Sequence, residues 1–325
     1  MNRRNFIKSS LSTLAAVPAL RFNGPEAAAE EKITKVAVVK TRDRKSGIKQ
    51  AVGLLDLPPM KGKRIFLKPN FNTADPFPAG THNDTLTALI REIKSRDAAT
   101  ITLGERSGPP PTQKVLEEKG IFALSKELGF EVVNFEDLAE ADWKTLNPPG
   151  NHWPNGFLVP RPLAEAEYMV ATCCLKTHQY GGVFTMSLKL AVGATPKKLM
   201  RDLHSSPHQR LMIAEINTAF APKLIVMDGL EAFVDGGPST GRKVAADVII
   251  AGTDRVAVDA VGVAVLKELG SNDAIMGRKI FEQEQIMRAA ELGLGISLPR
   301  EVELTASDET SSLYAEKLKT ILAEG

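Results

Sequence analysis

The sequence predicts an α/β fold with a doubly wound, mainly parallel sheet. Short strands rich in Val, Ile and Leu alternate with segments of helical periodicity, which is the order typical of β-α-β units. Several strands are continuous apolar runs, as expected for a sheet that helices cover on both faces. The 325 residues, 43% hydrophobic and 25% charged, suffice for a large core. We expect two lobes around one cleft, with a boundary in the proline-rich stretch near residues 139–165.

The first half of the chain predicts a regular alternation of strands and helices. Asn83 or Asp84 can cap the second helix, whose apolar residues recur at helical spacing. Gly120 interrupts the third helical segment, because glycine has a low helix propensity. Strands are expected at residues 35–40, 64–68, 100–103 and 131–135, and helices at 46–55, 83–95 and 112–128.

The second half predicts strands that are more widely spaced. The segment 168–175 is continuously apolar, which is typical of a strand buried on both faces. It contains the two cysteines of the chain, Cys173 and Cys174, which we expect to be buried and unbridged; a strained vicinal disulfide is the alternative. Further strands are expected at residues 224–227, 247–251 and 302–305, and helices at 255–269, 273–291 and 311–323.

Residues 1–29 have the features of a twin-arginine export signal. Arg3 and Arg4 precede two large apolar residues and a lysine, and three alanines at 27–29 suit cleavage. The apolar stretch at 11–20 is too short to remain as a membrane anchor. We therefore expect a periplasmic or otherwise extracytoplasmic protein that uses the twin-arginine export machinery and has no lasting membrane span once cleaved. An amphipathic helix with a chance arginine pair is the alternative.

The charge of the chain argues against a nucleic-acid partner. The full sequence has a formal net charge of +2, but the signal region contributes four basic residues and one acidic residue. The remainder therefore has a net charge close to −1. It contains no basic patch large enough to predict nucleic-acid binding.

Polar side chains gather where the predicted strands end, which is the edge at which parallel sheets bind ligands. Lys68 and Asn70 follow the second strand, and Lys176 and His178 follow the buried strand at 168–175. Lysine ammonium groups suit a small anion such as a carboxylate or a phosphate. His178 could be an acid–base catalyst or a metal ligand, because imidazole titrates near neutral pH.

A glycine turn and a third lysine continue this cluster. Gly181 and Gly182 lack side chains, so their backbone N–H groups could approach a bound ligand closely. Lys189 follows on a short helix with a threonine or serine available as its cap, and we pair it with His178 as the catalytic residues. The alternative is a solvated turn whose lysines point to water.

Carboxylates after the later strands suggest a divalent metal. Asp228 and Asp254 each follow a predicted strand and would hold a metal or orient the site. The stretch from Asp228 to Asp235 is expected to be a flexible loop, and a plain surface loop is the alternative. His204 and His208 have the spacing of a helical metal pair, but the proline between them argues against a shared helix face.

A series of short motifs together resembles the family called domain of unknown function 362 (DUF362). Their order and spacing carry the resemblance, which extends over nearly all of residues 30–325. Leu190 stands where the family usually has an asparagine, so no polar role is carried over to that position. The motifs are Leu67–Asn70, Leu175–His178, Ser187–Lys189 with Gly193, Ile225–Gly229, Gly237–Pro238, and Ala251–Asp254 with Ala257–Asp259.

The resemblance also bears on cofactors. Many relatives carry a ferredoxin-like segment with repeated Cys-X-X-Cys, whereas this chain has two adjacent cysteines, so we expect no iron–sulfur cluster from its own cysteines. A weaker similarity links the chain to nickel-dependent lactate racemases, which also have a histidine, a glycine-rich turn and a lysine in this order. Their lysine holds a nickel-bearing nucleotide, and His178 and Lys189 would occupy comparable places.

The sequence as a whole predicts an exported enzyme, or enzyme-like protein, that binds a small anionic ligand with lysine and histidine side chains. A divalent metal would be a possible cofactor. The alternative is a non-catalytic ligand-binding or redox-accessory protein that uses the same cleft.

Overall fold

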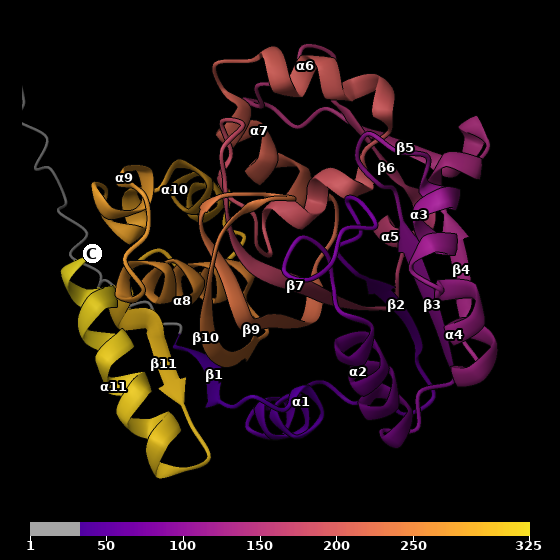
Figure 1. Ribbon diagram of the computed structural model, residues 1–325. Helices are drawn as coiled ribbons and strands as arrows, with labels where there is room; N and C mark the ends of the chain where they lie inside the picture. The colour runs from indigo at the N-terminus through magenta and orange to yellow at the C-terminus, as the bar shows by residue number, and fades with distance from the viewer. Residues whose placement is uncertain (1–32) are drawn as a thin grey trace, which may run out of the picture. The chain divides into compact units, whose positions relative to one another are not determined.

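A nine-stranded sheet runs through the computed structural model, which describes residues 33–325 (Figure 1). Five of the seven pairings along its main path are parallel, and β10 runs antiparallel to both of its neighbours. The mainly parallel sheet that the sequence predicts is therefore confirmed. In spatial order the path consists of β11 (Val302–Thr305), β1 (Thr34–Lys40), β10 (Gly241–Gly252), β9 (Pro222–Gly236), β7 (Tyr168–His178), β2 (Arg64–Lys68), β3 (Thr100–Glu105) and β4 (Glu131–Asn134), and β8 (Val183–Phe184) pairs with β7 outside it.

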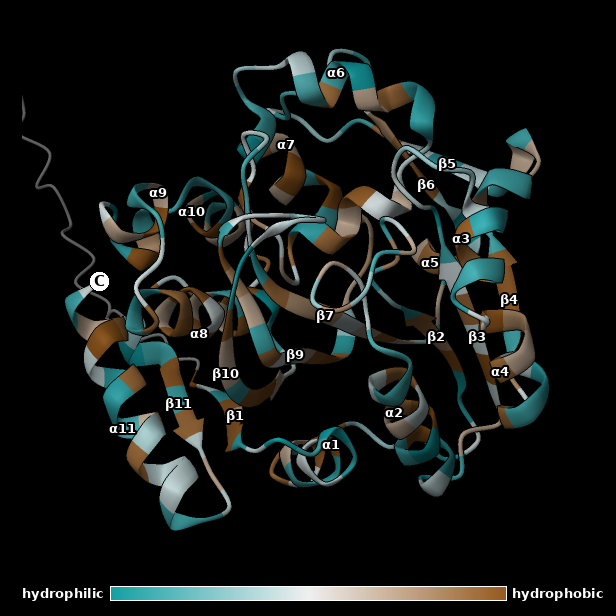
Figure 2. Cartoon of the chain, in the orientation of Figure 1, coloured by the Kyte–Doolittle hydropathy of each residue, from teal (hydrophilic) through white to brown (hydrophobic). Residues whose placement is uncertain are grey.

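Helices cover both faces of the sheet, as expected for a doubly wound fold. Alternate residues of one strand join the two different cores, so Val36 and Val38 face one side and Ala37 and Val39 the other. In Figure 2 the strands of the sheet carry much of the hydrophobic colour, and the helices alternate hydrophobic and hydrophilic segments. One face is covered by α1 (Arg44–Gly53), α2 (Asn83–Ser95), α3 (Thr112–Glu118) and α4 (Ile121–Leu128), and the other by α8 (Arg255–Glu268), α10 (Glu284–Glu291) and α11 (Glu309–Glu324).

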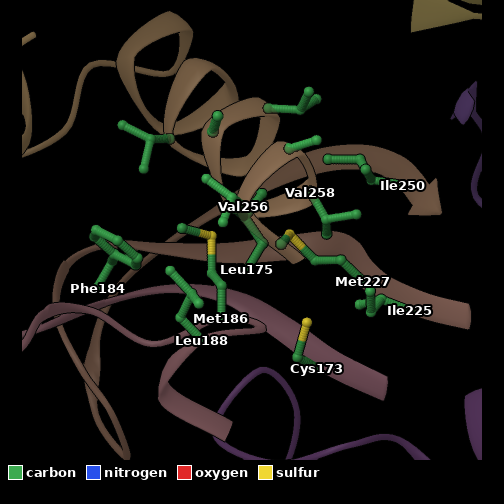
Figure 3. Packing of buried hydrophobic residues seen from close by; sticks show 14 of the residues in the cluster. Cys173, Leu175, Phe184, Met186, Leu188, Ile225, Met227, Ile250, Val256 and Val258 are labelled. Carbon is green, nitrogen blue, oxygen red and sulfur yellow. The ribbon is translucent and has the colours of Figure 1, made fainter. Parts of the chain in front are cut away.

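The central strand β7 is buried along its whole length. Cys173 lies in the core against α8, close to Met186 and Met227 (Figure 3). Cys174 belongs to the core on the opposite face, because adjacent strand residues point in opposite directions. Both thiols are buried and free, which confirms the prediction that they are core residues and not a vicinal disulfide.

The hairpin of β9 and β10 is the largest difference from the predicted elements. Both strands are longer than expected, and β9 continues to Gly236, so the stretch from Asp228 to Asp235 is strand and not a flexible loop. Cross-strand pairing holds it in place, for example between Ala232 and Val244. The carboxylates and glycines in this stretch are uncommon in strands, so the local composition does not predict one.

Two helical predictions have different outcomes. Gly120, with φ of +67°, separates α3 from α4, as the sequence indicates. The helix expected at 273–291 is wrong as one element. It consists of α9 (Asp273–Met276), a 3-10 turn and α10.

Residues 139–164 contain a small sheet of their own. The hairpin of β5 (Trp143–Leu146) and β6 (Phe157–Pro160) is followed by α5 (Arg161–Ala164). Trp153 and Phe157 form a third core with α6 (Met200–Ser205) and α7 (Gln209–Ile216). The described residues 33–325 belong to one compact unit, and the small sheet near the boundary expected at 139–165 lies within that unit.

The predicted export signal, residues 1–29, lies outside the described residues. Within residues 33–325, no helix is long and apolar enough to cross a membrane.

Candidate functional site

The candidate site lies where the winding of the sheet reverses. From β2 the chain moves outward to β3 and β4, whereas from β7 it moves to β9 on the other side. Because β2 and β7 are adjacent and parallel, their connections leave in opposite directions and open a crevice at the carboxyl ends of the strands. The ends of β2, β3 and β7 bring Lys68, Glu105 and His178 to this crevice.

Two adjacent cavities occupy this region. An inner cavity of about 50 Å³ adjoins an open cleft of about 900 Å³, and Arg106, His178 and Lys189 line both. Glu105 and Thr185 also line the inner cavity, although neither was predicted from the sequence to bind a ligand. The predicted site residues that line the inner cavity are Lys68, Asn70, Lys176, His178 and Lys189.

Lys68 and Glu105 form a buried ion pair in the lining of the inner cavity. Lys68 Nζ lies 2.5 Å from Glu105 Oε1 and also donates to the Pro69 carbonyl oxygen at 2.8 Å. The carboxylate accepts the backbone N–H groups of Phe71 and Arg106 at 2.8 and 2.9 Å. Burial lowers the pKa of Lys68 and raises the pKa of Glu105, and the attraction between the two charges opposes both shifts.

Lys176 and Arg106 bring positive charge that no carboxylate pairs with directly in the described part of the chain. Lys176 Nζ donates to Asn70 Oδ1 at 3.1 Å and to the carbonyl oxygens of Ala79 and Pro238. Arg106 donates to three backbone carbonyl groups. Burial lowers the pKa of Lys176 and lowers that of Arg106 to about 10.

Lys189 differs from the other two lysines, because its ammonium group has no hydrogen-bond partner among residues 33–325. Its side chain is only 8% exposed, at the start of the 3-10 turn Lys189–Ala194. Burial, together with the charges of Lys176 and Arg106, lowers its pKa to about 7. The amine is therefore partly neutral near physiological pH.

Asp259 on α8 positions the turn that carries Lys189. Its carboxylate accepts the backbone N–H groups of Ser187 and Leu188 at 2.7 and 2.9 Å. The cap is thus supplied by a distant residue and not by a nearby serine or threonine as expected. Burial raises the pKa of Asp259 to about 7, although the two backbone hydrogen bonds act in the opposite direction.

His178 offers a hydrogen-bond donor to the cavities. Its Nδ1 accepts the backbone N–H of Gly182 at 3.3 Å, which places the proton of the neutral ring on Nε2. Burial, followed by the charges of Lys189 and Lys176, lowers the pKa of His178 to about 2. The ring is therefore neutral at physiological pH, and it can accept a proton only by giving up its bond to Gly182.

Gly181 and Gly182 shape the site but line neither cavity. The N–H of Gly182 is bound to His178, so the expectation that it binds a ligand is corrected. A Cβ on Gly182 would lie 2.7 Å from Lys189 Cε and 2.9 Å from His178 Nδ1. Only glycine therefore lets these two side chains approach at this point. Gly181 has a φ of +81°, which glycine adopts without strain.

Asp228 and Asp254 lie outside both cavities, and their assignment as metal ligands is corrected. Asp228 is bound by Arg44 at 2.8 Å and by the Thr85 hydroxyl. Asp254 caps α8 and accepts three backbone N–H groups. No group of three or more metal-ligating residues occurs within residues 33–325, and the positive lining of the inner cavity does not fit a divalent cation.

The two other histidines considered as a metal pair do not share a helix face. His204 lies in α6, and His208 is the cap residue that precedes α7. His204 lines the outer cleft, where its Nδ1 contacts the side-chain amide of Gln209 at 2.9 Å.

Comparison with known proteins places this site in a family context. A thylakoid-associated protein of Synechocystis sp., sll1697, is 24% identical over 250 residues, which is 74% of each chain. The lactate racemase apoprotein from Thermoanaerobacterium thermosaccharolyticum covers 89% of this chain, and 87% of its own chain is covered, with a TM-score of 0.42 and 12% identity. A likeness of that size bears on neither substrate nor chemistry.

The family match is more extensive. Residues 65–264, more than half of the chain, match the family described as Domain of unknown function (DUF362). This range includes every residue that lines the inner cavity. The chain therefore belongs to the DUF362 family.

Proposed function

We propose that this protein is exported and that its inner cavity binds the acidic group of a small carboxylate or phosphate, with Lys189 and His178 as the reactive pair. The charge of the lining carries the proposal. Lys176, Arg106 and Lys189 contribute positive charge, whereas Glu105, the one carboxylate among the described residues of the lining, is already paired with Lys68. Buried charge without a counter-charge is costly, and a bound anion supplies one.

The donors that remain available support the same ligand. Lys189 has no hydrogen-bond partner in the described part of the chain, and the buried hydroxyl of Thr185 has none either. His178 adds an N–H at Nε2. These donors suit the oxygens of one carboxylate or phosphate group, since each charge-assisted hydrogen bond contributes about 1.5–3 kcal/mol. The rest of the ligand would extend into the outer cleft.

Anions are expected to raise the melting temperature of the protein more than chloride does at matched ionic strength. A ligand that binds only the folded state stabilises it by about 2.7 kcal/mol at a hundredfold excess over its Kd. Phosphate, sulfate and small carboxylates can be compared by thermal unfolding. Lys189→Met removes one charge without leaving a protein group unpaired, so it should lose most of the difference between ions.

Two comparisons separate this effect from general salt effects, which also stabilise proteins. Lys45→Met, on the exposed surface of α1, is the matched control and should keep the parent's response. If Lys189→Met responds to phosphate as strongly as the parent, the ions act on the whole surface and the anion site is wrong.

The export part of the proposal rests on residues 1–29. The double substitution Arg3→Lys and Arg4→Lys is expected to leave the protein in the cytoplasm with its signal uncleaved, because the arginine pair is the recognition element. Cell fractionation and the size of the product measure this. Arg21→Lys, in the same region but outside the pair, is the control. Normal export of the double variant would show that another route is used.

A further inference from the structure

The amine of Lys189 is arranged differently from those of the two lysines beside it. Lys68 donates to a carboxylate and a carbonyl oxygen, and Lys176 donates to three oxygen atoms. Such contacts hold a proton on nitrogen and keep its lone pair from reacting. Lys189 has none of these contacts among residues 33–325. It is thus the lysine of the site whose nitrogen is free to react with a ligand.

The surroundings of Lys189 favour its neutral, nucleophilic form. Its side chain is buried, and the neighbouring charges of Lys176 and Arg106 disfavour a second ammonium group. Desolvation beside other cations is an arrangement that activates lysine as a nucleophile. Lys189 also lines both the inner cavity and the cleft, so a ligand that enters the inner cavity passes its amine.

We propose that Lys189 forms a Schiff base with a small anion that carries an aldehyde or ketone group, such as a 2-oxo acid. This inference rests on the anion site proposed above. In a 2-oxo acid the carbonyl carbon is bonded directly to the carboxylate. A carboxylate that accepts from the unpartnered Thr185 hydroxyl in the inner cavity, beside the positive charge of Lys176, therefore places the carbonyl carbon towards the outer cleft, which Lys189 also lines.

The reaction needs no oxidant or reductant. The Nζ lone pair of neutral Lys189 attacks the carbonyl carbon and forms the C–N bond. The carbonyl oxygen leaves as water, and both hydrogens of the amine end on that water molecule, which gives the C=N bond. His178 contributes as a neutral donor, because a hydrogen bond from Nε2 to the carbonyl oxygen polarises the bond that is attacked.

Reductive trapping tests the proposal. The purified full chain is incubated at pH 7.5 with pyruvate, glyoxylate or glycolaldehyde phosphate, each with sodium cyanoborohydride, and the modified peptides are mapped by mass spectrometry. The adduct is expected at Lys189, since its neutral fraction at this pH exceeds that of an exposed lysine by roughly a hundredfold or more. Acetone, a ketone without an acidic group, should give far less product.

Two variants refine the test. Lys189→Arg keeps the positive charge but is not nucleophilic, so it should retain an ion-specific melting shift and lose the adduct. Lys189→Met should lose the adduct and most of the ion-specific shift. Each variant is checked for a cooperative melting transition. The position of the adduct in the parent protein decides the question even if a variant does not fold.

The outcomes distinguish this inference from the anion site on which it depends. If lactate and pyruvate both raise the melting temperature of the parent above the chloride control, but none of the three carbonyl probes modifies Lys189, the Schiff base is wrong and the anion site stands. If neither ion raises the melting temperature above the chloride control, the proposed anion site is wrong. Adducts spread evenly over exposed lysines would also overturn the proposal.

Discussion

Replacement of Glu105 by alanine is expected to destabilise the protein by about 3–5 kcal/mol, because it leaves the buried ammonium group of Lys68 without its partner. Both side chains of this pair are 2% exposed, so water cannot replace the lost carboxylate. The substitution also leaves the backbone N–H groups of Phe71 and Arg106 without their acceptor. A loss of this size is a large part of the about 5–15 kcal/mol that stabilises a typical domain.

Urea unfolding of single and double variants measures this effect. Lys68→Met with Glu105→Gln removes both charges, so its cost should be smaller than the sum of the single costs. Glu231→Ala is the control, because Glu231 pairs with Lys243 at 3.1 Å with both side chains more than two-fifths exposed. Such surface pairs contribute about 1 kcal/mol or less. A cost for Glu105→Ala no larger than that of Glu231→Ala would contradict the proposed burial of the pair.

The parts of the fold that could be predicted are those with local signals. The strands β1, β2, β3 and β7 are apolar runs that end at polar residues, prolines or glycines, and they lie within a few residues of their expected positions. The β9–β10 hairpin carries such signals only at residues 224–227 and 247–251, where the two shorter strands were expected. Asp228, Glu231 and Asp235 interrupt the apolar pattern, and the segment is a strand because it pairs with β10 and in part with β7. That pairing is a tertiary effect that a local pattern does not contain.

Some residues of the candidate site could likewise be predicted from local signals, whereas others depend on tertiary contacts. Lys68, Lys176 and His178 could be found because parallel strands place their carboxyl ends together. Asp228 satisfied the same rule on sequence, but its strand continues past it and its carboxylate turns to Arg44. Glu105 also ends a strand, but its pairing with Lys68, 37 positions away in the chain, could not be predicted from the sequence.

The role of Asp259 could not be predicted from the sequence either, because the residues that it binds are distant in the chain. Its carboxylate caps the turn before Lys189 from more than 70 positions further along the chain. Only its place in the Ala257–Asp259 motif could have drawn attention to it. The sequence therefore shows which residue types meet at the site, whereas the contacts that set their charge and reactivity come from the fold.

The affinity of the site for sulfate is expected to fall steeply as the pH rises above neutrality. An anion binds best to the protonated form of Lys189, whose pKa in the empty protein is about 7. Its Kd should therefore be nearly constant below that value and increase by about tenfold for each pH unit well above it. Sulfate remains a dianion over this range, and His178, with a pKa of about 2, stays neutral. Titration calorimetry between pH 6 and pH 9 measures the change.

In the empty protein the same pKa shift acts on stability with the opposite sign. The pKa of Lys189 is about 7 when folded, below its ordinary value of 10.5. Between these two values the unfolded chain binds a proton that the folded chain has released, so the contribution of Lys189 favours folding increasingly as the pH rises. Bound sulfate cancels this trend, because it returns the proton to Lys189 and raises its pKa.

Lys189→Met is the variant that isolates this residue. Asp259 also has a pKa of about 7 and lies close to the turn, but it is retained in the variant. Lys176 and Arg106 also remain, so residual sulfate binding should be weaker than in the parent at pH 6 and nearly independent of pH. If the affinity of Lys189→Met falls with pH as steeply as that of the parent, another group governs the pH dependence. Lys189 would then be a spectator, both as anion ligand and as the neutral amine of the site.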